Sequence, residues 1–159
     1  MIDNISWLAV YPEIVLLIMG CVIALVDLGV QSARRTATYA LTLLTMVVVA
    51  VLEAMYATSG NTFYGWGNMV VSDPMGNWLK CFASIAMVIT LIYGRPYAAD
   101  RGMLRGGGEL FTLSIFSLLG MFVMISANNF LMIYLGLELL TLSSYALVAL
   151  RRDHEGAVE

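Results

Sequence analysis

The chain has 159 residues, of which 60% are apolar and only 12% are charged, and its mean hydropathy is +0.85. A water-soluble domain usually carries about a quarter charged residues, and a core this small cannot hide such a surplus of apolar ones. The composition therefore excludes an ordinary soluble enzyme and predicts a protein whose surface faces lipid. The net charge of −3 decides little, because in a membrane protein the position of each charge along the chain matters more.

Five apolar stretches are long enough to be membrane-spanning helices. They cover residues 12–30, 36–56, 75–93, 110–126 and 129–150. At ~1.5 Å per residue, each crosses most or all of a hydrocarbon layer of ~30 Å. Residues 57–74 form a turn-rich connection, and residues 94–109 form a polar loop in which three consecutive glycines act as a flexible connector. Residues 1–159 are therefore expected to be an all-α integral membrane protein with five transmembrane helices.

The basic residues of the chain give this layout a sidedness. Seven of the eight follow the first, third or fifth predicted span, which are alternate connections on one side of the membrane: Arg34, Arg35, Arg95, Arg101, Arg105, Arg151 and Arg152. By the positive-inside rule that side is the cytoplasm. The N-terminus is then outside and the C-terminus is cytoplasmic, while Trp66 and Trp78 lie near the outer interface, which amphipathic rings favour.

The motifs of soluble enzymes are missing from the sequence. It has no GxGxxG fingerprint, no GxxxxGK[ST] phosphate loop and no grouping typical of a Ser-His-Asp triad. Cys21 and Cys81 lie inside apolar runs without metal-ligand spacing, which favours two small buried apolar side chains. We therefore expect no metal site, no bound cofactor and no nucleic-acid partner.

Four charged residues lie toward the ends of the predicted spans. Glu13, Asp27 and Glu53 are within about one turn of a span end, where a carboxylate can cap a helix or reach the interface, and this favours a structural role. Lys80 lies about six residues into the third span, and its long stem could carry the ammonium to the outer interface. For Lys80 a structural role and a functional role both remain open.

Glu138 differs from these residues because it is near the middle of the fifth predicted span. An acidic residue there costs about 2.5–3.5 kcal/mol, so it needs a protein partner, a water-filled cavity or a bound proton. Tyr134 precedes it by four residues, and Thr141 and Tyr145 follow at spacings that place all four on one stripe of a helix. The stripe predicts a proton-handling carboxyl with a polar path beside it. The alternative is a neutral glutamic acid that donates a hydrogen bond between helices.

Two further features of the sequence bear on Glu138. Lys80 is the one cation inside a predicted span, and its depth differs from that of Glu138 by about 5 Å, so the sequence leaves a direct pair open. Gly136, Ser143 and Ser144 offer small surfaces on the same helix, where other helices can approach.

The segment around Glu138 also resembles a known family. From Tyr134 to Val148 it reads Tyr-Leu-Gly-Leu-Glu-Leu-Leu-Thr-Leu-Ser-Ser-Tyr-Ala-Leu-Val, similar to the fifth transmembrane helix of subunit N of bacterial NADH:quinone oxidoreductase, respiratory complex I. The mitochondrial counterpart is subunit 2. Supporting matches are Glu109-Leu-Phe, Gly120-Met-Phe-Val-Met, Asp73 before the third span, and Pro12-Glu13 in the first. The resemblance covers the N-terminal part of the family.

The resemblance implies an antiporter-like fold of about fourteen helices, of which the second half is absent here, so that the chain is a fragment or a truncated gene product. It implies a redox-centre-free translocase subunit of the bacterial inner membrane. Such a subunit moves protons while other subunits pass electrons from NADH to quinone. Its partners are the other membrane subunits of the complex. Glu138 maps onto the family's fifth-helix glutamate, whose charge is modulated by a lysine on the seventh helix. A Mrp-type cation/proton antiporter subunit and a non-catalytic membrane scaffold are the alternatives.

Overall fold

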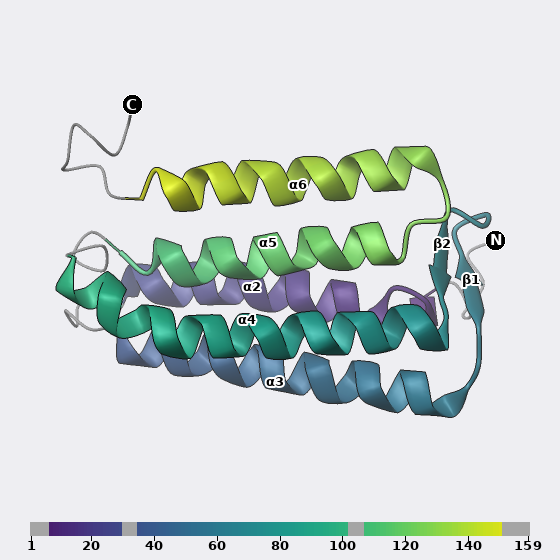
Figure 1. Cartoon of the computed structure of the whole chain (residues 1–159), viewed down its shortest axis with the longest axis horizontal. Helices are drawn as coiled ribbons and strands as arrows, with labels where there is room; N and C mark the ends of the chain where they lie inside the picture. The colour runs from purple at the N-terminus through teal and green to yellow at the C-terminus, as the bar shows by residue number, and fades with distance from the viewer. Residues whose placement is uncertain (1–6, 30–34, 102–106, 151–159) are drawn as a thin grey trace.

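The computed structural model describes residues 7–29, 35–101 and 107–150. Within these ranges five long helices run alternately up and down (Figure 1): α2 (Tyr11–Gly29), α3 (Thr36–Ser59), α4 (Pro74–Asp100), α5 (Glu109–Ile125) and α6 (Phe130–Val148). Four are long and apolar enough to cross a membrane, and α5 is a shorter apolar helix of 17 residues. The prediction of a helical membrane protein with these five helices is therefore confirmed.

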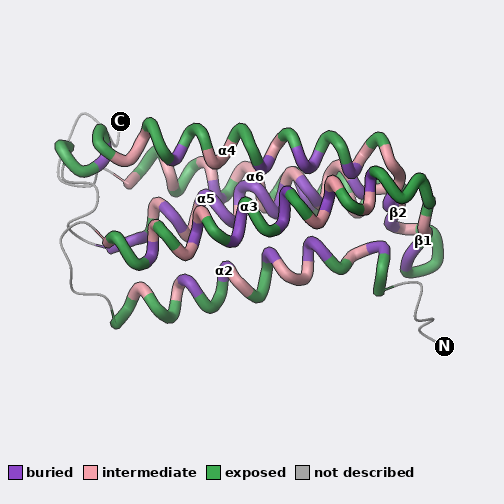
Figure 2. Tube along the Cα trace, turned by 90° about the horizontal axis from the view of Figure 1, so that it is seen from below, coloured by how far each residue is buried: buried purple, intermediate pink, exposed green. Residues whose placement is uncertain are grey.

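Helix α5 is the centre of the bundle, since it contacts each of the other four helices. Its fully buried side chains Phe111, Ile115 and Phe122 form the core together with Leu16 of α2 and Met46 of α3. Figure 2 shows the buried residues of α2 on the side that faces the other helices. Apolar side chains are equally at home in lipid and in the bundle, so the hydrophobic effect does little to bring these helices together. The van der Waals contacts of this close packing stabilise the bundle instead.

Helix α6 lies at the edge of the bundle, on the other side of α5 from α3 and α4 (Figure 1). It packs most extensively against α5, and only Gly136 and Ser143 among its residues are buried. Most of its circumference is therefore left uncovered by the described part of the chain.

The connection between α3 and α4 contains a short hairpin, formed by β1 (Phe63–Gly65) and β2 (Val70–Ser72). It is fastened to the turn between α5 and α6, because the Val71 N–H donates to the Ser126 carbonyl oxygen at 2.8 Å. The sequence predicted only a turn-rich connection here. Strands of three residues are too short to show the alternation of apolar and polar residues that marks a strand. The all-α prediction therefore omitted a hairpin that covers one end of the bundle (Figure 1).

The third predicted span ended at residue 93, and this boundary is wrong. Helix α4 continues to Asp100 through Pro96. Loss of hydropathy marks the edge of the membrane rather than the end of a helix, and the alanines after Pro96 favour helix. Arg95 fastens the extension to the start of α3, because its Nη2 donates to Thr36 Oγ1 at 3.0 Å.

Three arginines of the sidedness prediction are described, and they lie at the same end of the bundle, away from the hairpin. Arg35 precedes α3, Arg101 follows α4, and Arg95 lies in the last two turns of α4. Trp66 in the hairpin loop and Trp78 in the first turns of α4 lie at the opposite end. Arg34, Arg105, Arg151 and Arg152 lie outside the described residues. The clustering is confirmed for these three, and the assignment of their side to the cytoplasm stays a prediction.

Candidate functional site

Glu138 lies near the middle of α6, on the face that points away from α5. Tyr134 and Tyr145 flank it on the same face, with 59% and 69% of their surface exposed. Thr141 is half-buried, and its hydroxyl donates to the Glu138 backbone oxygen at 3.0 Å. Among the residues that the structure describes, the Glu138 carboxylate has no hydrogen-bond or ion-pair partner. The predicted stripe therefore exists, but it faces outward.

The opposite face of α6 explains this orientation. Gly120 of α5 and Gly136 of α6 lie against each other, and a Cβ atom on Gly120 would be only 2.7 Å from the Leu140 backbone nitrogen. A Cβ atom on Gly136 would lie 2.8 Å from the Met124 backbone nitrogen. The prediction that Gly136 and Ser143 receive a neighbouring helix is confirmed, and this contact fixes the rotation of α6 that turns Glu138 outward.

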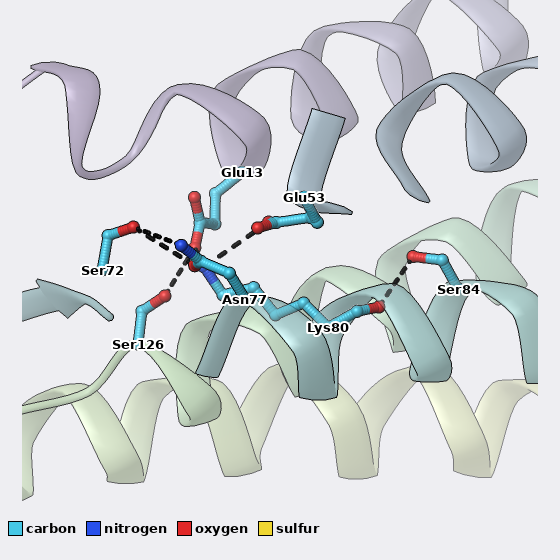
Figure 3. Close-up of polar contacts among 7 residues, drawn as sticks. All are labelled: Glu13, Glu53, Ser72, Asn77, Lys80, Ser84 and Ser126. Carbon is cyan, nitrogen blue, oxygen red and sulfur yellow. Dashed lines mark hydrogen bonds and ion pairs between the residues drawn. The ribbon is translucent and has the colours of Figure 1, made fainter. Parts of the chain in front are cut away.

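A second group of charges lies at the hairpin end, inside the bundle (Figure 3). Lys80 of α4 is 1% exposed, and its Nζ lies 2.6 Å from Glu13 Oε1 of α2 and 3.5 Å from Glu53 Oε1 of α3. Glu13 and Glu53 are 4% and 0% exposed. Ser126, which follows α5, donates its hydroxyl to Glu13 Oε1 at 2.6 Å. We call Glu13, Glu53 and Lys80 the Lys80 cluster.

The prediction that Glu13 and Glu53 reach the interface is wrong. Helix α3 runs to Ser59, so Glu53 lies six residues, or about 9 Å, from the helix end and too deep for its short side chain to reach water. Glu13 is near the start of α2, but the ammonium of Lys80 and the hydroxyl of Ser126 hold its carboxylate inside. Lys80 likewise does not reach the interface and does not pair with Glu138, because both of its partners are in the cluster.

The cluster had a signal in the sequence. Glu53 and Lys80 each lie six residues from the hairpin end of their helix, and Glu13 lies two residues from that end of α2. Alternation of the helices brings these three ends together. Charges of opposite sign at one depth in a membrane are expected to pair inside the bundle. Recognising this pattern requires the correct helix ends. The second predicted span ended at residue 56, three residues before Ser59, so Glu53 was taken to lie close to the interface.

Apolar and neutral polar groups surround the charges of the cluster. The Lys80 Nζ lies 5.6 Å from the centroid of the Phe122 ring, within the range of a cation–π contact. Close by, the buried Asn77 side chain donates to Ser72 Oγ of β2 at 3.1 Å (Figure 3). The hairpin therefore contributes a polar side chain to this end of the bundle.

Asp27 has a structural role at the other end of the bundle, as predicted. Its Oδ2 accepts the Gly108 N–H at 2.6 Å at the start of α5, and its Oδ1 accepts the Thr38 hydroxyl at 2.8 Å. Arg35 Nη1 lies 3.2 Å from Oδ1. Gly108 therefore does more than connect two helices, because a Cβ atom there would overlap the Asp27 carboxylate. Gly106 lies outside the described residues.

Within residues 7–29, 35–101 and 107–150, no three His, Cys, Asp or Glu side chains gather as metal ligands. The two carboxylates of the Lys80 cluster already share an ammonium, which takes the place that a cation would occupy. Both cysteines are free thiols, and the prediction that they are buried is confirmed for Cys81 but wrong for Cys21, which lies on the exposed side of α2. The chemistry available at both charged sites is therefore that of carboxyl groups, hydroxyls and one amine.

Comparison with known proteins gives consistent relatives, although no family model matches the chain. All 159 residues align at 74% identity with NADH-quinone oxidoreductase subunit N of Polaromonas naphthalenivorans, of which they cover 32%. Identity to the same subunit is 52% in Herminiimonas arsenicoxydans, over 99% of the chain and 32% of the relative. It is 46% in Cupriavidus taiwanensis, over 91% of the chain and 29% of the relative.

The chain thus spans about a third of the length of these relatives. The relatives are bacterial, and the long apolar helices fit a multi-pass protein of the bacterial inner membrane. The resemblance found in the segment around Glu138 extends over the whole chain at high identity. The chain therefore belongs to the family of NADH-quinone oxidoreductase subunit N.

Proposed function

We propose that the chain is part of a redox-centre-free membrane subunit that translocates protons in NADH:quinone oxidoreductase. The observation that carries this proposal is the 74% identity, over the whole chain, to a subunit with that name. Electron transfer from NADH to quinone takes place elsewhere in the enzyme and drives the pumping. The other membrane subunits of the enzyme are its partners. The high identity to subunit N disfavours an independent cation/proton antiporter.

Glu138 is the proton-handling carboxyl in this proposal. Glu138 lies near the middle of an apolar helix of membrane-spanning length, which supports a position deep in the hydrocarbon layer, where a charged carboxylate is costly without a partner. A cation at 4 Å contributes about 4 kcal/mol at an effective dielectric constant near 20, which is enough to decide between the charged and the neutral form. A partner that approaches and withdraws therefore makes the carboxyl release and take up a proton.

The cation for this switch lies outside the described bundle. Lys80 is committed to Glu13 and Glu53. The side of α6 that carries Glu138 is uncovered, and the relatives are about three times as long as this chain. The remainder of such a subunit supplies the partner and covers this side. Tyr134, Thr141 and Tyr145 add hydroxyl groups along the same face, which can relay protons to and from Glu138.

The test is Glu138→Gln in the complete enzyme, with Ser144→Ala as a matched control on the same helix. NADH-driven proton uptake into inverted membrane vesicles is measured per amount of assembled enzyme. We expect a several-fold loss of pumping in Glu138→Gln and none in the control, because glutamine keeps the shape but cannot exchange a proton. Normal pumping in Glu138→Gln would reject Glu138 as a proton carrier and leave a scaffold role for this helix.

A further inference from the structure

The Lys80 cluster contains more negative than positive charge. Two carboxylates face one ammonium, so the cluster would carry a net charge of −1 if all three groups were ionised. An uncompensated charge in a dry interior is expensive, and a buried carboxyl usually takes up a proton instead. We propose that the Lys80 cluster is a second proton-binding site of the subunit, which holds one exchangeable proton between Glu13 and Glu53.

Unpartnered oxygen atoms support this proposal independently of the charge count. Both oxygens of Glu53 and Oε2 of Glu13 are buried without a hydrogen-bond partner among the described residues. A carboxylate accepts several hydrogen bonds and is costly to bury with none, whereas a protonated carboxyl needs fewer. The cluster therefore lacks the donors that two buried carboxylates require.

In the arrangement described, the proton belongs to Glu53. Glu13 Oε1 accepts hydrogen bonds from the Lys80 ammonium and the Ser126 hydroxyl, both at 2.6 Å, as a carboxylate does. Glu53 is fully buried, and its closest approach to Lys80 Nζ is 3.5 Å, which is too long for a strong charged hydrogen bond. Glu13 is therefore the counterion of Lys80, and Glu53 is the neutral acid.

Within the described residues, the neighbouring helices bring no further charge that would move the proton away from Glu53. The other titratable groups near Glu53 are Tyr56 on its own helix and Cys81 on α4, both of which are neutral near pH 7. The end of α5 contributes the neutral groups Phe122 and Ser126. Lys80 is thus the one cation close to the two carboxyls in the described part of the chain.

This arrangement allows the proton to change places without a change of total charge. If the Lys80 ammonium moves from Glu13 to Glu53, the proton leaves the Glu53 carboxyl and is taken up by the Glu13 carboxylate. Lys80 keeps its three protons, and the cluster keeps its single extra one. The site can therefore pass a proton between α2 and α3 at the hairpin end of the bundle, independently of Glu138.

The test uses infrared difference spectra of the purified complete enzyme, wild type against Glu53→Gln. A protonated carboxyl has a carbonyl stretch separate from that of a carboxylate, and the band shifts in D₂O when its proton exchanges. We expect Glu53→Gln to assemble normally, since glutamine resembles a neutral glutamic acid, and to lose one such band that shifts in D₂O. Glu13→Gln is the matched variant. It too loses one acid band, because Glu53 must then ionise to pair with Lys80, but it assembles less well because Glu13 loses its contacts with Lys80 and Ser126.

Each alternative result overturns part or all of the proposal. An unchanged carbonyl region in Glu53→Gln means that the cluster holds no proton. A band that is lost but does not shift in D₂O means that the proton is not exchangeable. Failure of Glu53→Gln to assemble while Glu13→Gln assembles means that the structure needs the charge of Glu53. None of these readouts depends on pumping, so they are separate from the test of Glu138.

Discussion

The two acidic sites of this bundle differ in what surrounds them. The Lys80 cluster joins three helices, is shielded from water and contains its own cation. Glu138 lies deeper along its helix, yet it is on the outside of the bundle and has no partner among the described residues. Depth in the membrane and enclosure by protein are therefore separate properties. The five helices enclose one site, whereas in the proposed function the other is completed by the rest of a longer subunit.

The largest expected effect comes from removing the cation of the enclosed site. In the complete enzyme, Lys80→Met leaves Glu13 without its counterion, and breaking a buried pair in this way costs about 3–5 kcal/mol. The measurement is the thermal midpoint and the yield of assembled enzyme in membranes. The control is Leu79→Met, which introduces the same residue at the exposed neighbouring position. It should leave the thermal midpoint and the yield unchanged. A Lys80→Met enzyme as stable as the control would mean that the cluster does not hold the three helices together.

An intermediate effect is expected where α6 is attached to the bundle. A Gly120→Ala side chain meets the backbone of α6 and not a flexible side chain, so the two helices must separate at a cost of about 1–3 kcal/mol. Because α6 carries Glu138, we expect the same variant to reduce proton pumping. Gly94→Ala is the control, since nothing lies within 4 Å of a Cβ atom there. Full stability and full pumping in Gly120→Ala would show that Glu138 tolerates displacement of its helix.

The smallest effect is expected at the ion pair of Asp27 and Arg35. Arg35→Met removes a cation as Lys80→Met does, but Asp27 keeps hydrogen bonds from Gly108 and Thr38 and lies near the aqueous end of the bundle. We expect a loss of about 1 kcal/mol, as is usual for partly exposed pairs. The same thermal measurement compares the two substitutions directly. Equal losses in Arg35→Met and Lys80→Met would mean that burial does not set the difference between the sites.

Several features of the protein were predictable from individual stretches of sequence. Each of the five helices is a local run of apolar residues, and local runs are visible without knowledge of the fold. Arg35, Arg95 and Arg101 share one end because successive helices run in opposite directions, so the end at which a residue lies follows from the number of helices before it. The hairpin and the end of α4 were missed, since strands of three residues have no readable period and helices continue past the membrane edge.

The sequence by itself therefore determined the membrane class, the number of helices and the position of Glu138 near the middle of its helix. Only the tertiary structure decided which charges meet, because Lys80 and Glu13 are 67 positions apart and their 2.6 Å contact depends on how three helices pack. It also decided that Glu138 faces outward, through the close approach of Gly120 and Gly136. A residue's distance along a helix follows from its position in the chain, whereas its direction around the helix has meaning only relative to a neighbour.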